Sequence, residues 1–308
     1  MKRINTLGVI VLDALSGPIG EYPTRRGRTQ VVTKRVQFMP GGGAANTGCA
    51  LAKMGLPAGI FAKIGDDFAG RFLLDEIARS GADTRGVRAS KTESTPFTFV
   101  AIHDDGDRTF IHTPGANLTY SPADVDLERL LATDLLLWQD LWVKPAIDGA
   151  PGAAILAEAR RRGVVTLLDE CFGLGPNRET LEAMLPHCDY FLPSLDDMRV
   201  LWPGASPEEV ARTLLARGTG TVVLKMGADG CLLARGTERV HVPVFPTKVV
   251  DATGAGDSWD AGFLAALAHG EPAEVAARVG NAAASFCIQA VGGSAGIPKY
   301  EAVRAKAM

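Results

Sequence analysis

The sequence lacks the features that mark several large classes of protein. Its 32 basic and 35 acidic side chains leave a formal charge of −3, and no long run carries one sign. The electrostatic signature of a nucleic-acid-binding or membrane-surface protein is therefore absent. No apolar stretch reaches the roughly 18 residues expected of a membrane-spanning helix. A small molecule is the expected partner, with no nucleic acid and no membrane.

Cysteines are few and form no recognisable pattern. They are Cys49, Cys171, Cys188, Cys231 and Cys287, and no two of them form a C-x-x-C pair. Five scattered cysteines argue against a disulfide framework or a structural zinc site. The first apolar run is broken by Asp13, so that no signal peptide is expected. We therefore predict a cytoplasmic protein with reduced thiols.

Two common nucleotide-binding motifs are also missing. A P-loop needs a lysine after its second glycine, whereas Asp257 follows Gly256 here. The G-x-G-x-x-G fingerprint of dinucleotide-binding folds does not follow the first strand-like segment. The sequence therefore disfavours a P-loop nucleotidase and a dinucleotide-dependent enzyme.

Strand-like and helix-like segments alternate along the chain. Short apolar runs such as residues 164–170 (VVTLLDE) are followed or preceded by amphipathic segments that end on glycine, such as residues 152–163. This alternation predicts an α/β fold with a mostly parallel central sheet, with helices on both faces and ligands at the carboxyl ends of the strands. Without repeats or linkers, residues 1–308 are expected to form one domain.

Two segments do not fit this alternation. Residues 28–39 and 96–113 alternate apolar with polar side chains, and the second contains DDGD, which is typical of a hairpin turn. They predict a small antiparallel lid inserted at about residues 14–40 and 96–114. Such a lid would exclude water from a site below it, while a surface hairpin without catalytic duty fits the same pattern.

Residues 249–267 (VVDATGAGDSWDAGFLAAL) place small residues between an apolar strand and an apolar helix. Gly254, Ala255 and Gly256 would lie at the helix N-terminus, where free backbone amides and the helix dipole favour an anion such as a phosphate. Asp257, in the first turn, could accept a proton from an attacking hydroxyl. First-turn acids commonly only complement the dipole, and the spacing alone favours that explanation.

A second glycine cluster, PGGGAANTG at residues 40–48, also leads into a helix. Its glycines would let the backbone approach a polar ligand, and Asn46 offers both a donor and an acceptor. A sugar or nucleoside hydroxyl would suit these groups. Asp13 ends the first predicted strand, where a ligand-binding acid would lie, although such acids also cap turns.

Taken together, GGGAANTGCALAKMG and DATGAGDSWDAGFLAAL resemble the paired signatures of the ribokinase-like (PfkB) carbohydrate kinases. Other blocks, including PSLDDMRVL and VVLKMGADG, are similar to successive blocks of that family. The resemblance implies a three-layer α/β/α fold with a β lid. It also implies transfer of the γ-phosphate of ATP to a hydroxyl of a sugar or nucleoside.

The resemblance further implies a role for individual residues. Asp257 would be the general base, and the amides of Gly254, Ala255 and Gly256 would form the anion hole. The sugar-contacting positions would be Asp13, Gly42, Gly43 and Asn46. The nucleotide-lining positions would be Lys225, Gly227, Gly230 and Asn281. A monovalent cation, usually K⁺, would be held by Asp251, Thr253, Ala290 and Gly293.

Two positions depart from the family pattern. Where the family has N-x-x-E, this chain has Ser194 and Asp197. Asp197 keeps a carboxylate that would hold Mg²⁺ through waters, on a side chain one methylene shorter. Ala252 stands where serine or threonine is commoner, so that K⁺ is a less firm expectation than ATP and Mg²⁺.

Specificity for the acceptor is expected to come from the sugar side of the site. Its members would include Asn117, the strand end at Gln139 and Asp140, and lid residues such as His112. Lys144 could meet an acidic substituent. We expect a ketose, an aldose or a sugar acid as substrate; a nucleoside kinase of the same fold and a non-catalytic sugar-binding regulator are the alternatives. Open lid edges predict a homodimer formed through the lid.

Overall fold

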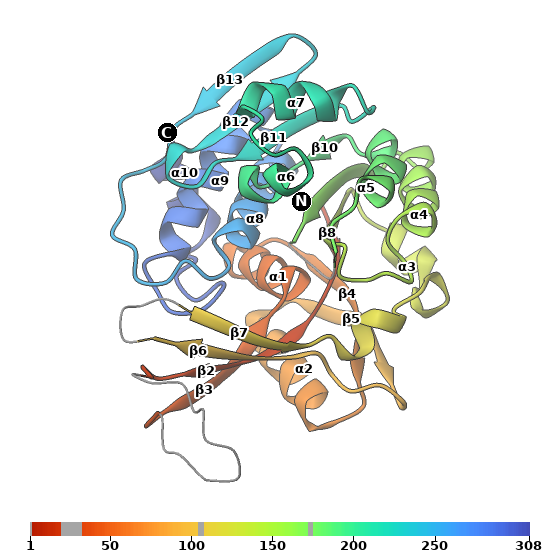
Figure 1. Cartoon of the computed structure of the whole chain (residues 1–308), viewed down its shortest axis with the longest axis vertical. Helices are drawn as coiled ribbons and strands as arrows, with labels where there is room; N and C mark the ends of the chain where they lie inside the picture. The colour runs from red at the N-terminus through yellow and green to blue at the C-terminus, as the bar shows by residue number, and fades with distance from the viewer. Residues whose placement is uncertain (1, 20–32, 104–107, 172–174) are drawn as a thin grey trace.

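A mixed sheet forms the centre of the computed structural model, which describes residues 2–19, 33–103, 108–171 and 175–308 (Figure 1). Among these residues, nine strands pair in the order β13-β12-β11-β10-β9-β8-β1-β4-β5. They are β1 (Ile4–Leu7), β4 (Ala58–Gly65), β5 (Asp83–Ser90), β8 (Leu135–Leu141), β9 (Val165–Glu170), β10 (Tyr190–Phe191), β11 (Thr221–Lys225), β12 (Cys231–Arg235) and β13 (Glu238–Val242). The strands from β11 to β5 run parallel, and β12 and β13 extend one edge antiparallel. The predicted α/β class is confirmed.

Helices cover both faces of this sheet and give the fold its three layers. They are α1 (Gly43–Met54), α2 (Phe68–Ser80), α3 (Leu127–Leu131), α4 (Ala150–Arg161), α5 (Arg178–Met184), α6 (Leu195–Leu201), α7 (Pro207–Leu215), α8 (Ala255–Ala268), α9 (Ala273–Cys287) and α10 (Tyr300–Ala307). Leu137 of β8 shares a buried core with α1, α8, α9 and α10, whereas Trp138, the next residue, packs among α3 to α7. Alternate residues of one buried strand thus serve two cores.

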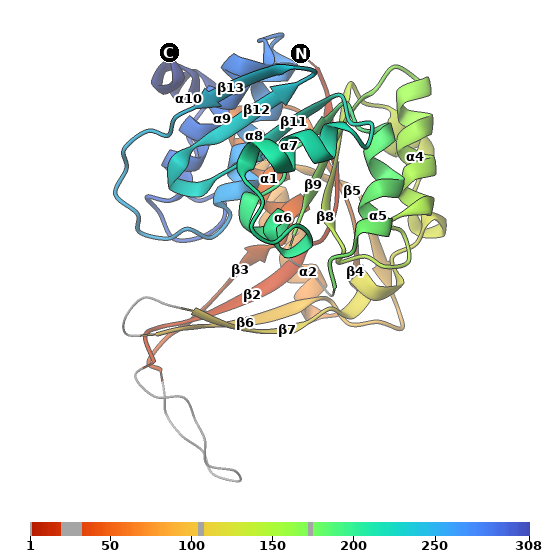
Figure 2. The ribbon, with the colours of Figure 1, turned by 45° about the horizontal axis from the view of Figure 1, so that its top comes forward.

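The lid is a separate sheet of four strands in the order β3-β2-β6-β7. They are β2 (Val11–Ser16), β3 (Val36–Gly41), β6 (Phe97–Ile102) and β7 (Arg108–Thr113). Figure 2 shows them extending away from the three-layer body. The predicted small lid sheet is confirmed: β3 pairs antiparallel with β2 and β7 with β6, while β2 and β6 pair in parallel at the centre. The predicted DDGD turn lies outside the described residues.

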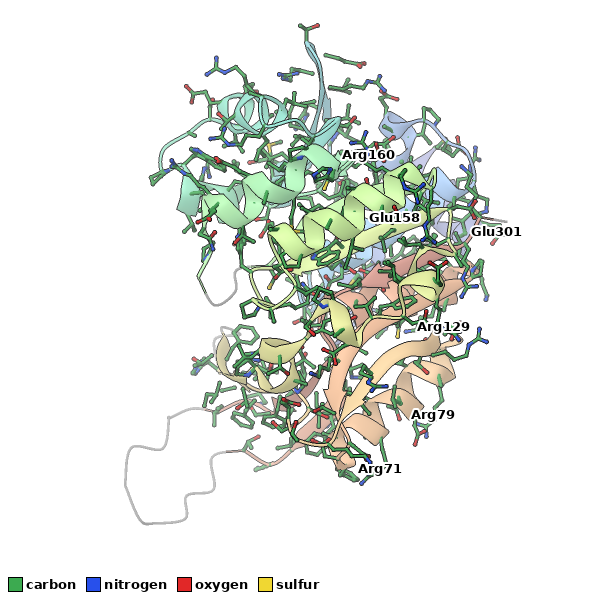
Figure 3. All side chains as sticks on the ribbon, turned by 90° about the vertical axis from the view of Figure 1, so that its right-hand side faces the viewer. Arg71, Arg79, Arg129, Glu158, Arg160 and Glu301 are labelled. Atoms are coloured by element: carbon green, nitrogen blue, oxygen red, sulfur yellow. The ribbon has the colours of Figure 1, made fainter. Side chains whose placement is uncertain are left out.

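Charges of both signs are mixed over the surface. Figure 3 shows this on the side that carries α4, where Glu158 and Arg160 lie beside each other on the helix. Arg161 and Arg162 both pair with Glu158, at 2.6 Å in each case. Exposed pairs of this kind contribute little to stability. Within the described ranges, no helix is both long and apolar enough to cross a membrane.

The carboxyl edge of the central sheet is where the chain gathers its polar groups. β8 ends near Asp140 and β9 ends with Asp169 and Glu170, all three of which are buried. The N-termini of α1 and α8 lie at the same edge, and the two helices pack against each other. In parallel sheets this edge is where ligands bind, so the site is built from these elements.

Candidate active site

Helix α8 begins at the glycine run that the sequence singled out. Gly254 is its N-cap residue in the left-handed conformation, with φ of 71°, and Ala255 and Gly256 open the helix. A Cβ on Gly254 would collide with the backbone of Gly293, so only glycine fits this position. Among the residues that the structure describes, no side chain caps the helix start. Its first backbone amides are the donors that an anion would meet.

Asp257 lies in the first turn of α8 and is bound by α1. The Asn46 amide nitrogen donates to Asp257 Oδ2 at 2.8 Å, and Thr47 Oγ1 donates to the Asp257 carbonyl at 3.0 Å. Burial raises the pKa of Asp257 to about 6, while the hydrogen bond from Asn46 acts to lower it. Two glycine-led helix starts, more than two hundred residues apart in the sequence, therefore meet at one carboxylate.

Lys225, at the end of β11, lies beside the start of α8. Its Nζ donates to Asp169 Oδ1 at 2.9 Å and to Asp260 Oδ1 at 3.1 Å. A Cβ placed on Gly256 would lie 3.7 Å from this Nζ. Burial alone would lower the pKa of Lys225, but the two carboxylates raise it overall, and the side chain stays charged.

Asp13, in the lid strand β2, contributes a second carboxyl group. Burial raises its pKa to about 7, against the effect of a hydrogen bond with Thr98. Thr98 stands opposite Asp13 on β6, and its hydroxyl lies 3.0 Å from Nδ1 of His112 on β7. Asp13, Thr98 and His112 thus form a row of polar side chains across three lid strands. The negative charge of Asp13 also acts to raise the pKa of Asp257, so both acids belong to one site.

The glycines at the start of α1 make room for the Val9 carbonyl and for the Asp140 carboxylate. Gly42 has φ of 86°, and a Cβ on it would lie 2.5 Å from the Val9 carbonyl oxygen. A Cβ on Gly43 would lie 2.7 Å from Asp140 Oδ1. The close approaches explain why small residues are needed here, and they bring Gly42, Gly43 and Asn46 together beside Asp257.

Gln139 and Asn117 are buried with unused hydrogen-bonding capacity. Gln139 Nε2 donates to Thr47 Oγ1 at 2.8 Å, whereas its Oε1 has no hydrogen-bond partner within the part of the chain that the structure describes. The same holds for both amide atoms of Asn117, whose side chain is 1% exposed. Buried polar atoms of this kind favour a polar ligand or water. Their role as sugar contacts stays a prediction.

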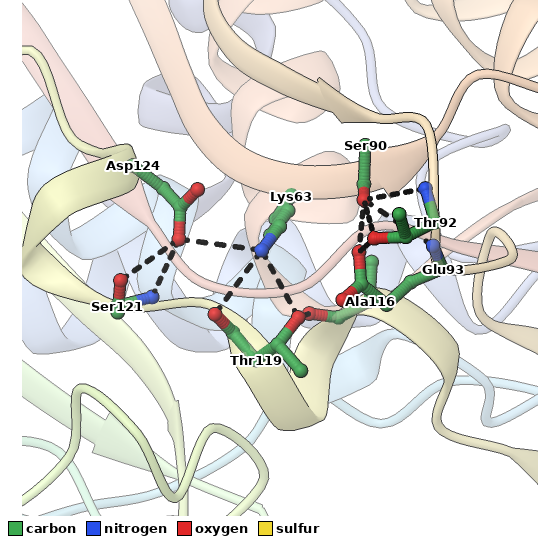
Figure 4. Close-up of polar contacts among 8 residues, drawn as sticks. All are labelled: Lys63, Ser90, Thr92, Glu93, Ala116, Thr119, Ser121 and Asp124. Atoms are coloured by element: carbon green, nitrogen blue, oxygen red, sulfur yellow. Dashed lines mark hydrogen bonds and ion pairs between the residues drawn. The ribbon is translucent and has the colours of Figure 1, made fainter.

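The turn that carries Asn117 is anchored by a lysine. Lys63 of β4 donates to the carbonyl and the hydroxyl oxygen of Thr119, at 3.1 and 3.0 Å, and pairs with Asp124 at 3.4 Å (Figure 4). Asn117 and Thr119 belong to one short 3₁₀ turn, Gly115–Thr119. Lys63 thus ties this turn to the central sheet.

The residue expected to hold Mg²⁺, Asp197, lies in the first turn of α6, beside Glu170 at the end of β9. Ser194 caps α6 by accepting the amide of Asp197, and its own amide donates to Glu170 Oε1 at 2.7 Å. Glu170 and Asp197 lie close enough for each to affect the pKa of the other. Burial and the neighbouring acids Asp169 and Asp197 raise the pKa of Glu170 well above its usual range. Proteins usually bind Mg²⁺ with one or two carboxylates plus substrate phosphates, which these residues fit.

The residues expected to hold K⁺ meet where two loops join. Asp251 Oδ1 accepts the amide of Thr253 at 2.7 Å, and its Oδ2 accepts the amide of Gly292 at 3.0 Å. The thiol of Cys287 lies 3.5 Å from the Thr253 carbonyl oxygen and 3.4 Å from that of Gly293. Asp251 therefore anchors both loops beside the start of α8.

Four further residues complete these regions. Ala290 begins the second loop, where its amide donates to the Cys287 carbonyl at 3.1 Å. On the nucleotide side, Gly227 and Gly230 flank the turn after β11, with φ of 58° and 86°. The amide of Asn281 is used within the protein: it accepts from Trp259 Nε1 and donates to the carbonyls of residues 242 and 243. Its predicted contact with the nucleotide stays a prediction.

Sequence reasoning missed three acids and misplaced one lysine. Asp169 and Glu170 end a strand that the apolar pattern did predict, so their position at the carboxyl edge could have identified them. Asp260 lies one helical turn after Asp257, which is a weaker signal. Lys144 is wholly buried and bound to backbone carbonyls of residues 139 and 140, so the suggestion that it meets an acidic substituent is wrong.

Comparison with known proteins places the chain among sugar kinases. The family model described as pfkB family carbohydrate kinase matches residues 8–300. An uncharacterized sugar kinase of Archaeoglobus fulgidus is 30% identical over 81% of this chain and 98% of the relative. The ribokinase of Bacillus subtilis is 28% identical over 97% of each chain. The 5-dehydro-2-deoxygluconokinase of Lacticaseibacillus casei is 27% identical over 89% of this chain and 87% of the relative.

A solved structure agrees with these relatives. Arabidopsis thaliana ribokinase complexed with ribose and ATP superposes with a TM-score of 0.86 at 26% identity, covering 99% of this chain and 98% of that one. The predicted resemblance and the predicted ribokinase-like fold are both confirmed. With its Asp257 site at the carboxyl edge of the sheet, the chain belongs to the pfkB family of carbohydrate kinases and is an ATP-dependent carbohydrate kinase.

Proposed function

We propose that this kinase transfers the γ-phosphate of ATP to a hydroxyl of a small sugar, with Asp257 as the general base. The observation that carries this proposal is the 2.8 Å hydrogen bond from Asn46 to Asp257, which joins the two glycine-led helix starts. It brings an acid, a polar amide and the backbone amides that open α8 to one point. Phosphoryl transfer depends mainly on such positioning and on charge stabilisation.

Asp257 would take the proton from the attacking hydroxyl. With its pKa raised to about 6 by burial, it is mostly ionised at neutral pH yet basic enough to accept a proton. Asn46 engages one carboxylate oxygen, Oδ2, and so sets the plane in which the other oxygen meets the hydroxyl. The same amide group keeps Asp257 from rotating when the acceptor arrives.

The amides of Gly254, Ala255 and Gly256 would receive the charge of the transferring phosphoryl group. They open α8 without a competing side-chain cap, and the helix dipole adds to their attraction for an anion. Lys225 lies next to them and remains charged. Preorganised donors of this kind are worth about 10²–10³-fold in rate each.

Asp197, with Glu170 beside it, would hold Mg²⁺ through waters. The ion, when bound, neutralises charge on the ATP phosphates. Asp251, Thr253, Ala290 and Gly293 would hold a monovalent cation next to the anion hole. The two loops that carry them are joined by Asp251, which supports a shared role.

A second part of the proposal is that the protein is a cytoplasmic homodimer. The lid supports the dimer. Its edge strands β3 and β7 expose large apolar side chains, among them Phe38 at 54% and Ile111 at 54%. An edge of this kind is usually covered by another chain. We expect light scattering to give twice the chain mass, and Phe38→Asp to shift it toward the monomer. Val200→Asp, at an exposed valine on α6, is the control; a monomeric wild type would refute the dimer.

Replacing the base is the direct test of the mechanism. Asp257→Asn is expected to lower kcat by at least roughly 10²-fold, because it removes the proton acceptor but keeps the shape of the side chain. Binding of ATP and sugar, measured by calorimetry, should remain. Asp196→Asn, at an exposed carboxylate on α6, is the control. Turnover near that of the wild type would show that Asp257 is not the base.

The pH dependence of kcat/KM tests the environment of Asp257. Activity should fall as the pH drops through about 6, because the base becomes protonated. Asp13 and Asp140 have pKa values raised to about 7 and titrate nearby, so a variant is needed to identify the group. Asn46→Ala should move the acid limb to higher pH, since the lost hydrogen bond lowers the pKa. An unmoved limb would assign it to another group.

The acceptor class is tested by an ATP-consumption screen over ketoses, aldoses, sugar acids and nucleosides, with and without K⁺. We expect consumption with at least one sugar or sugar acid and none with nucleosides. Asp257→Asn, run in parallel, separates acceptor-dependent turnover from background hydrolysis. Consumption with nucleosides alone would overturn the sugar assignment.

A further inference from the structure

The end of strand β8 has an unusual backbone. Asp140 and Trp142, with φ of 57° and 73°, are the two non-glycine residues with positive φ in the described ranges. Trp138 pairs with Leu168 of β9, but Leu141 pairs with Glu170, so β8 contains one extra residue in this interval. A bulge of this kind re-aims a side chain, and backbone strain persists only where surrounding contacts hold it.

A buried lysine supplies those contacts. Lys144 has no exposed surface, and its Nζ donates to the carbonyl oxygens of Gln139 at 2.5 Å and Asp140 at 2.7 Å. The charge is balanced by Asp148, 3.3 Å away, whose other oxygen accepts the Lys144 amide. The cation thus holds the two carbonyls of the bulge toward itself. This leaves the Asp140 side chain directed away, toward α1.

The Asp140 carboxylate, which belongs to strand β8, caps the N-terminus of helix α1. Its Oδ2 accepts the Val9 amide at 2.8 Å and its Oδ1 accepts the Gly43 amide at 3.1 Å. Gly43 is the first residue of α1, and the N-cap residue of that helix, Gly42, has no side chain to offer. A carboxylate at this position satisfies a free amide and complements the helix dipole. Gly8 leaves space for it, since a Cβ there would lie 2.5 Å from Asp140 Oδ2.

The cap acts on α1, the helix whose Asn46 donates a hydrogen bond to the proposed base, Asp257. Asn46 follows Gly43 by three residues, and its amide makes the first helical hydrogen bond, to the Gly42 carbonyl at 3.0 Å. We propose that Asp140, held in its left-handed conformation by Lys144, is a positioning residue that fixes the start of α1 and thereby places Asn46 against Asp257. The inference rests on the proposed role of Asp257 as base.

The test begins with Asp140→Asn. Asparagine also tolerates positive φ, so the backbone can be kept while an NH₂ group replaces one of the two acceptors. We expect kcat/KM for the sugar to fall roughly 10- to 100-fold, as small misplacements of catalytic groups do. The KM for ATP should stay within about twofold, since the anion hole belongs to α8. A rise in the KM for ATP as large as the loss on the sugar side would overturn the proposal, because the start of α8 would then be disturbed as well.

A double-mutant cycle with Asn46→Ala tests the route of the effect. If Asp140 acts through Asn46, the double variant loses little more than Asn46→Ala alone. If the loss of activity in the double variant equals the product of the two single losses, the coupling is refuted. Asp189→Asn is the control: its carboxylate also accepts a backbone amide, that of Thr166 at 2.9 Å, at the opposite end of the sheet. This variant should retain wild-type kinetics.

Gly8→Ala covers the case in which Asp140→Asn does not fold. It crowds the same carboxylate without removing it, and the same selective loss on the sugar side is expected. Unchanged kinetics would count against the proposal. Failure of the base assignment is recognised separately: Asp257→Asn would then keep its turnover, while the cycle between Asp140 and Asn46 still reports whether the two are coupled.

Discussion

The contact between Asn46 and Asp257 is the constraint on which the rest of the site depends. It forms only if α1 and α8 begin at the same edge of the sheet, at a separation set by small residues. Glycines at the start of both helices meet that requirement. A Cβ on Gly43 would collide with the Asp140 carboxylate, and a Cβ on Gly254 would collide with the backbone of residue 293. The requirement for close backbone approach therefore explains much of the glycine pattern in this chain.

The fold was largely predictable because the spacing of apolar residues along the chain indicates which faces of a strand or helix are buried. Parallel strands that are buried on both faces read as continuous apolar runs, and β8 is one of them. The two glycine clusters were also recognisable, since a helix start needs no tertiary information. Asp260 was not recognisable, because its partner Lys225 comes from a distant strand. Lys144 was misread because its burial depends on the bulge, and nothing in the local sequence encodes a left-handed aspartate.

Acidic groups outnumber cations in this site. Asp13, Asp140 and Asp257 all have raised pKa values because burial penalises their charge. Lys144 and Lys225 are already engaged with carbonyls or carboxylates. ATP would bring further negative charge into this field. The divalent cation proposed near Asp197 would offset this repulsion during nucleotide binding as well as in the transfer step.

The path of the chain from β1 to β2 links the lid to the sugar side. β1 ends at Leu7 and β2 begins at Val11, so the central sheet continues into the lid after three residues. Asp13 is the third residue of that lid strand. Because Asp13 belongs to the lid sheet itself, any displacement of that sheet would also displace its carboxylate. The proposed contact with the acceptor and the proposed enclosure of the site would therefore come from one element of the fold.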